Sequence, residues 1–219
     1  MYMIIYTIIP VFARVRMKKK VLPYFNCERE EKNVEHKGVM VVVWAMQLAL
    51  QAGFSRAAPL KTEALRADPR VRSMCADGRC KRYGKCWSCP PGCGSIEDCQ
   101  KKMDAYAQGI LVQTTAQLED EFDAEGMAAA EKRHKKAFET LSRQMRSRYP
   151  DCLPLTAGGC SFCRKCTYPD KPCRFPHKSL SSMEAYGLLV SEVCSRSDLG
   201  YYYGPGTITY TSCILWNEQ

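Results

Sequence analysis

The sequence lacks the motifs that mark several large enzyme classes. It contains no phosphate-binding glycine loop, no dinucleotide-binding glycine pattern and no Ser-His-Asp series, the patterns that bind nucleotides or activate a serine nucleophile. Histidine is scarce at three residues. His177 could bind a metal, although a solvated loop histidine is the simpler interpretation. These absences assign no catalytic residue and favour a binding or redox accessory protein over a stand-alone enzyme.

Long apolar runs are also missing. A membrane-spanning helix needs about 20 apolar residues, whereas the opening segment is apolar only as far as Ala13 and includes Pro10. No positive region precedes this segment, so it is a poor signal peptide as well as a poor anchor. We therefore expect a cytoplasmic protein without a transmembrane segment, in which residues 1–38 are an N-terminal extension or linker.

The chain carries an excess of positive charge, and this charge is spread along the sequence. The net charge is +9, which raises the question of a nucleic-acid or acidic protein partner. No long Lys/Arg block or recognition helix stands out, which argues against nucleic acid. The segment around the second cysteine cluster is basic, and this favours an acidic redox partner.

Cysteine is abundant. The chain has 14 cysteines, with six between Cys75 and Cys99 and five between Cys152 and Cys173. Disulfides are typical of small secreted domains, whereas close C-x2-C pairs in a chain of 219 residues more often bind metal or perform redox chemistry. We therefore expect metal binding by both clusters.

Helix and strand patterns alternate along the chain, which predicts an α/β protein, with α+β as the alternative. We expect a mixed sheet flanked by helices, with ferredoxin-like cysteine-rich loops, in a single domain over residues 39–219. The charged residues 26–38 read as a linker. Helices are expected at 41–51, from the Ser95 capping box to about Ala107, at 119–148 as a solvent-exposed helix with a break at Gly126, and from the Ser181-x-x-Glu184 capping box to 196; strands are expected at 110–115, 152–157 and 207–216.

The second cluster has the clearest ligand spacing. Cys160, Cys163 and Cys166 follow a C-x2-C-x2-C pattern, similar to the bacterial ferredoxin run C-x2-C-x2-C-x3-C-P. Cys173 comes six residues later, and no proline follows it directly. The identity of the fourth ligand is therefore open.

The first cluster offers a second set of thiols: Cys75, Cys80, Cys86 and Cys89. They could bind a metal among themselves. Cys89 precedes Pro90, as the remote fourth ligand does in ferredoxins, so Cys89 could instead complete the site begun by the second cluster. Zinc is the alternative to iron and sulfur, because paired thiolates also hold zinc tetrahedrally.

The segments VRSMC, YGKCWSCPP, GGCSFCRKC, CRFP and SSMEAYGLLV occur in this order. Together they resemble the predicted metal-binding proteins known as domain of unknown function 2284, over roughly Trp44 to Leu215. The resemblance implies binding of an iron–sulfur cluster or another metal, with no settled reaction. It implies ligands at Cys75, Cys80 and Cys89 in the first motif and at Cys160, Cys163, Cys166 and Cys173 in the second.

The prediction is thus a cytoplasmic protein that holds one or two clusters, of the 4Fe-4S type, and serves electron transfer or assists a partner enzyme. Its metal ligands are expected among Cys75, Cys80, Cys86, Cys89, Cys160, Cys163, Cys166 and Cys173. A zinc-stabilised protein- or nucleic-acid-binding module and a cluster-based redox sensor are the alternatives.

Overall fold

The computed structural model describes residues 27–78 and 80–218. The apolar opening segment lies outside these residues. The chain divides into two units, Met1–Glu35 and His36–Gln219, and the layers described below belong to the second. The single-domain boundary at residue 39 stays a prediction.

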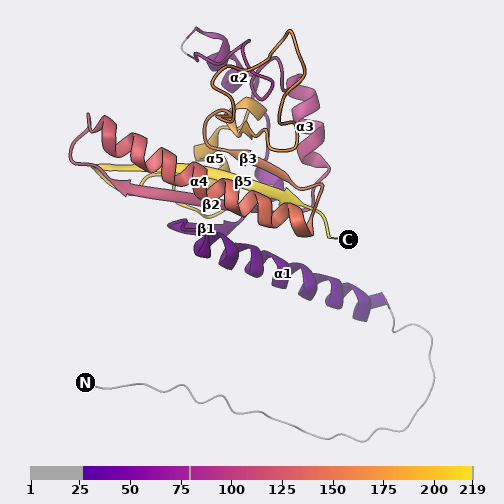
Figure 1. The fold of residues 1–219 in the computed structure, drawn as a ribbon. Helices are drawn as coiled ribbons and strands as arrows, with labels where there is room; N and C mark the ends of the chain where they lie inside the picture. The colour runs from indigo at the N-terminus through magenta and orange to yellow at the C-terminus, as the bar shows by residue number, and fades with distance from the viewer. Residues whose placement is uncertain (1–26, 79, 219) are drawn as a thin grey trace, which may run out of the picture. The chain divides into compact units, whose positions relative to one another are not determined.

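One mixed sheet of five strands forms the centre of the second unit (Figure 1), in the order β1-β2-β5-β3-β4. Its long strands β2 (Gln108–Gln117) and β5 (Thr207–Trp216) pair antiparallel along their whole length. β1 (Arg56–Pro59) joins the outer edge of β2. On the other side, β3 (Leu153–Thr156) runs antiparallel to β5 and parallel to the short β4 (Ser181–Ser182).

Five α-helices accompany the sheet in the described part of the chain, so the predicted mixed α/β class is confirmed. They are α1 (Cys27–Gln51), α2 (Pro69–Ala76), α3 (Ile96–Asp104), α4 (Ala124–Arg148) and α5 (Val190–Arg196), with 3-10 turns at Thr62–Ala64 and Glu184–Tyr186.

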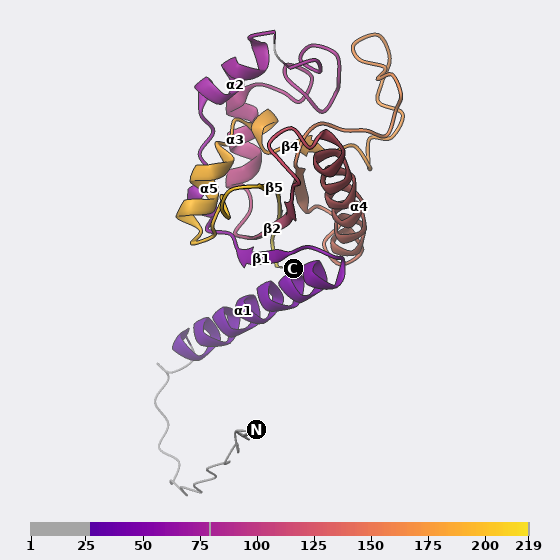
Figure 2. The same cartoon turned by 90° about the vertical axis from the view of Figure 1, so that its left-hand side faces the viewer.

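The two faces of the sheet bury different side chains, because successive residues of a strand point to opposite sides. Ile110 and Trp216 pack with α4 and the C-terminal half of α1. Leu111 and Leu215 pack with α3 and α5 on the opposite face. α4 therefore covers one face, and α3 and α5 cover the other (Figure 2).

Several predicted elements are confirmed. Ser95 and Asp98 form the expected capping box of α3, with both reciprocal hydrogen bonds present at 3.0 Å. The strands expected at 110–115, 152–157 and 207–216 are present as β2, β3 and β5. Gly53, expected to end the helix over 41–51, follows α1 with a φ of 103°, a left-handed conformation that glycine adopts without steric cost.

Other elements differ from the prediction. The segment expected as a linker is helical from Cys27, where α1 begins, and its role as a linker stays a prediction. α4 begins at Ala124 rather than near 119, continues through Gly126 without a break, and buries one face instead of lying in solvent. The helix expected from 183 to 196 is interrupted at Gly187, whose φ of 80° ends the first turn. The sequence patterns also gave no signal for β1 or α2.

Candidate metal centre

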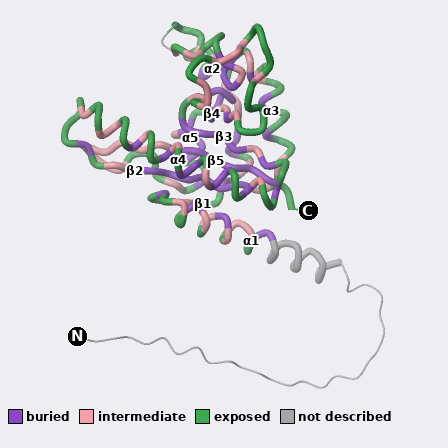
Figure 3. The backbone as a smooth tube through the Cα atoms, viewed as in Figure 1, coloured by how far each residue is buried: buried purple, intermediate pink, exposed green. Residues whose placement is uncertain are grey.

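The two cysteine-rich segments lie next to each other beyond the β3–β4 edge of the sheet, on the side away from β1 (Figures 1 and 2). The first comprises the end of α2 and the loop leading to α3, and the second is the loop that leaves β3 and returns in β4. These loops are mostly exposed or half-buried, whereas β2 and β5 are largely buried (Figure 3). The rigid sheet thus supports a loop region that has little apolar core of its own.

A cavity of about 370 Å³ lies between these loops. Thiols from both motifs line it, and Cys86 and Cys166 lie within electrostatic reach of each other. The first motif therefore contributes a thiol to the same cavity as the second. The five lining cysteines are Cys86, Cys160, Cys163, Cys166 and Cys173.

Specific contacts hold the two loops together beside this cavity. The Trp87 ring packs edge-to-face on Tyr168, with 4.9 Å between ring centroids. Its Nε1 also donates a hydrogen bond of 3.0 Å to the Lys171 carbonyl. The Arg82 guanidinium donates to the carbonyl of Cys160. Aromatic pairs of this geometry stabilise by roughly 1 kcal/mol beyond the area they bury, so Trp87 is a main tie between the motifs.

Two glycines allow the close approach. A Cβ on Gly92 would lie 2.6 Å from the backbone oxygen of Cys86 and 2.9 Å from the Tyr168 ring. A Cβ on Gly159 would lie 2.6 Å from Cδ of Arg82 and 3.4 Å from Sγ of Cys89. A side chain at position 92 would therefore press on the backbone of its own loop and on the Tyr168 ring of the other loop, whereas one at position 159 would have to displace the Arg82 side chain.

The thiols of the cavity have different acidities. Burial, followed by the neighbouring Cys166, raises the pKa of Cys86. Burial also opposes ionisation of Cys166, yet backbone N–H groups of Tyr168, Trp87 and Thr167 outweigh it and lower the pKa of Cys166. Backbone N–H donors stabilise a thiolate in the same way that they stabilise the sulfurs of a metal cluster.

The charged residues that line the cavity are all basic. The lining contains four cationic residues and no carboxylate. A cluster ligated by several thiolates carries negative charge, which these cations would stabilise. The four are Lys81, Arg82, Arg164 and Arg174.

The remaining predicted ligands form a neighbouring group in the first motif. Burial raises the pKa of Cys75, and the charge of Cys80 adds to the shift. Burial raises the pKa of Cys89 to about 11, and Cys86 and Cys80 contribute as well. Cys80 therefore lies within electrostatic reach of both Cys75 and Cys89, and none of the three lines the cavity.

Thiolates bind both single metal ions and polynuclear clusters, and these two need different arrangements of the sulfurs. In residues 27–78 and 80–218, no three Cys, His, Asp or Glu side chains converge closely enough to hold a single metal ion. The five cavity thiols instead surround a space. Sulfurs spaced around a volume can attach to different atoms of a polynuclear cluster, whereas one zinc ion would need four of them to close to about 2.3 Å.

Two histidines, His134 and His177, are possible further ligands, and both lie outside the cavity lining. His177 is exposed, and its carbonyl accepts a hydrogen bond from Arg146. His134 is fully buried between the Thr114 and Ser212 hydroxyls, at 3.0 and 2.7 Å. Neither lines the cavity, so the donors there are sulfur alone.

Sequence reasoning missed a second thiol pair. Cys93 and Cys99 share Arg72 as a neighbour, with Nη1 at 3.7 Å from Sγ of Cys93 and 3.5 Å from Sγ of Cys99. The two thiols titrate as a pair. The pKa for loss of the first proton is lowered, because the neighbouring thiol and then Arg72 stabilise one thiolate, and the pKa for loss of the second proton is raised. The five residues between these cysteines match no ligand motif, so no sequence pattern marked the pair.

Among the described residues, no helix has the length and apolar character needed to cross a membrane.

Comparisons with known proteins identify the family to which the chain belongs. No curated protein and no solved structure matches the chain. The family model described as predicted metal-binding protein (DUF2284) matches residues 58–216, which include both cysteine motifs and all five strands except the first two residues of β1. The chain therefore belongs to the DUF2284 family of predicted metal-binding proteins.

Proposed function

We propose that the cavity between the cysteine motifs holds an iron–sulfur cluster of the 4Fe-4S type, and that the protein serves electron transfer or acts as a redox accessory to a partner enzyme. When bound, such a cluster accepts and donates single electrons. Cys160, Cys163 and Cys166 supply three ligands, and either Cys86 or Cys173 supplies the fourth.

One observation carries this proposal: the five thiols surround a cavity of about 370 Å³ rather than meeting at a point. A cubane needs ligands at separated positions around a volume of several atoms. The backbone N–H groups near Cys166 support the same assignment, because N–H donors to sulfur tune the potential of a cluster.

The group formed by Cys75, Cys80 and Cys89 is the candidate for a second cluster. Three cysteines alone would leave one iron open to a further ligand. The resemblance to the family supports this centre, because it implies ligands at these three positions.

The surroundings of the cavity favour an acidic partner in a reducing compartment. Four cations and no carboxylate line it, so an acidic protein surface is attracted to the face where electrons would leave. The thirteen described cysteines from Cys75 to Cys213 form no disulfide. Free thiols in such number are typical of the cytoplasm, where we place the protein.

Anaerobic purification tests the proposal. We expect a brown protein with broad visible absorption and equal amounts of iron and acid-labile sulfide. The C166S variant should lose most of this iron, whereas C152A should keep it, because Cys152 is buried at the start of β3 outside the cavity lining. A colourless protein that carries zinc alone would overturn the proposal in favour of a zinc-stabilised binding module.

A further inference from the structure

Cys93 and Cys99 form a thiol pair apart from the proposed ligands. Nη1 of Arg72 lies 3.7 Å from Sγ of Cys93 and 3.5 Å from Sγ of Cys99. The Cys99 thiol also lies 3.9 Å from the carbonyl oxygen of Cys93. Neither cysteine lines the cavity of the five thiols. Two thiols held against the same guanidinium nitrogen are candidates for a disulfide, which forms when the sulfurs close to about 2.05 Å.

Arg72 is fixed over the two sulfurs by the backbone. It donates hydrogen bonds of 2.6 Å to the carbonyls of Ala185 and Gly94. No carboxylate in the described part of the chain forms an ion pair with it. A guanidinium held next to thiols favours the thiolate, which is the reactive form of cysteine.

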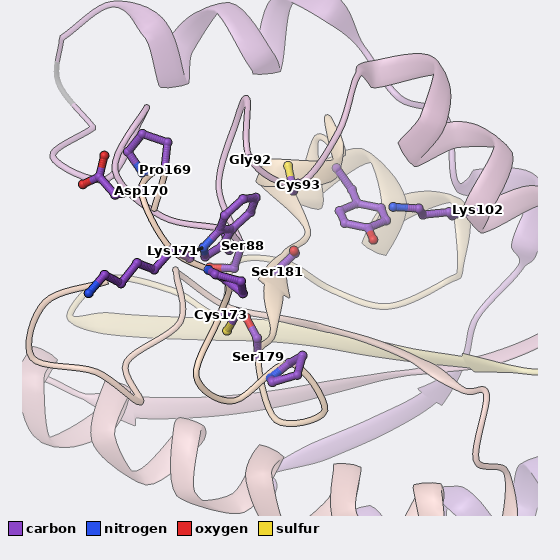
Figure 4. Close-up of a pocket in the computed structure, with 14 residues that line it drawn as sticks. Ser88, Gly92, Cys93, Lys102, Pro169, Asp170, Lys171, Cys173, Ser179 and Ser181 are labelled. Carbon is purple, nitrogen blue, oxygen red and sulfur yellow. Dashed lines mark hydrogen bonds between the residues drawn. The ribbon is translucent and has the colours of Figure 1, made fainter. Parts of the chain in front are cut away.

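Access to the pair is one-sided. Cys93 lines a second cavity, of about 620 Å³, as does the proposed ligand Cys173, whereas Cys99 is fully buried. Figure 4 shows Cys93 with Ser88 and Lys102 among the residues that line this cavity. A small reagent can therefore reach Cys93 first. Because Arg72 contacts both sulfurs, the single thiolate of the pair can form on Cys93, and Cys99 can then resolve the product.

We propose that Cys93 and Cys99 form a redox-active dithiol that hydrogen peroxide, entering through this cavity, converts to a disulfide. The Cys93 sulfur attacks one peroxide oxygen, the O–O bond breaks, and Cys93 becomes a sulfenic acid as the first water leaves. The Cys99 sulfur then attacks the Cys93 sulfur; the S–S bond forms, the S–O bond breaks, and the second water leaves. Two thiols and one peroxide thus give one disulfide and two waters, with peroxide reduced and the thiols oxidised.

Peptide mapping of the metal-loaded full chain tests this step. One equivalent of hydrogen peroxide is added, free thiols are alkylated under denaturing conditions with a chelator, and the chain is cut after Lys85 and Lys101. Cleavage after Glu97 then separates Cys93 from Cys99. We expect peptide 86–97 to be disulfide-linked to 98–101, with fragmentation assigning the bond to Cys93, and dithiothreitol to remove the link.

Variants separate this dithiol from the metal site. C93S and C99S should each abolish the link and keep the iron content of the wild-type protein, because neither residue lines the cavity of the five thiols. An unlinked wild-type chain after peroxide treatment would overturn the proposal. Loss of iron in C93S or C99S to the level of C166S would also overturn it, by making the pair metal ligands. A zinc-only protein that still forms the Cys93 to Cys99 bond would contradict the proposed function and support the dithiol.

Discussion

The Cys86 thiol of the first motif and the Cys166 thiol of the second line one cavity, close enough for Cys166 to help raise the pKa of Cys86. Each motif alone offers an incomplete or ambiguous ligand set. Because both motifs line this cavity, the fourth ligand can be sought among the cysteines of the cavity, with Cys86 and Cys173 as the candidates. It also makes Cys86, which the family likeness leaves outside the ligand positions, a candidate ligand on structural grounds.

We first predict that the fourth ligand of the cavity cluster is Cys86 or Cys173 and not Cys89. With Cys86 as the fourth ligand, C86S should lose most of the iron that C166S loses. With Cys173 as the fourth ligand, C173S should lose it instead. In both cases C89S should keep the cavity iron, because Cys89 does not line the cavity. Iron and sulfide per chain, measured after anaerobic purification, decide between them. Loss of that iron in C89S, with retention in C86S and C173S, would return the fourth ligand to Cys89.

The second prediction concerns the glycine that brings the loops together. G92A should destabilise the protein by about 1–3 kcal/mol, because the added Cβ meets the rigid backbone oxygen of Cys86 at 2.6 Å. G159A should cost less, because its Cβ meets the side chain of Arg82, which can move. Urea unfolding of both variants measures the difference.

Iron content gives an independent check on the same pair of glycine variants. G92A displaces the backbone that carries Cys86, so it should also lower iron per chain. Equal unfolding free energies for G92A and G159A would show that the approach at Gly92 is not tight.

Thirdly, stability should depend on pH through His134. Burial, with a smaller contribution from Lys135, lowers the pKa of His134 to about 3, below its ordinary value of 6.5. The folded state keeps the ring neutral while the unfolded chain takes up a proton below pH 6.5. The buried neutral ring therefore costs no stability above pH 6.5, and it lowers the free energy of unfolding progressively as the pH falls from 6.5 towards 3.

Between pH 7 and pH 5 this loss amounts to about 2 kcal/mol of unfolding free energy, at 1.36 kcal/mol per unit of pKa shift. In H134Q the loss should disappear, although the variant is less stable at pH 7 because a glutamine cannot replace both bonds to Thr114 and Ser212. Urea unfolding of both proteins at the two pH values measures it. Parallel losses in the two proteins would contradict the assignment.

A fourth prediction follows from the basic lining of the cavity. Oxidation of the reduced protein by ferricyanide, an anion, should slow as salt rises from about 0.01 to 0.5 M, because salt screens the attraction. R164E and R174E should weaken both the rate and its salt dependence. K132E, which makes the same charge change at an exposed position of α4 outside the lining, is the control. An equal effect of K132E would mean that net charge alone controls the rate.

Local patterns predicted the elements whose signals lie within a few residues. The Ser95 capping box and the strands over β2, β3 and β5 were all predictable, because caps and short apolar runs act locally. β1 was missed because four residues with a terminal proline carry almost no pattern. The helix expected over 183–196 was wrong, since Gly187 takes a left-handed φ that helix propensity does not reveal.

The sequence by itself determined that this is a mixed α/β protein of a metal-binding family with two thiol motifs, because composition and C-x2-C spacing are properties of neighbouring residues. Only the tertiary structure decided which thiols share a cavity and which form the separate Cys93 and Cys99 pair. The reason is geometric: the sheet brings the loop after β3 against the loop after α2, with glycine at Gly92 and Gly159 to let them touch. Residues that are far apart in the chain can make contact at any sequence separation, so no fixed spacing in the sequence predicts these contacts.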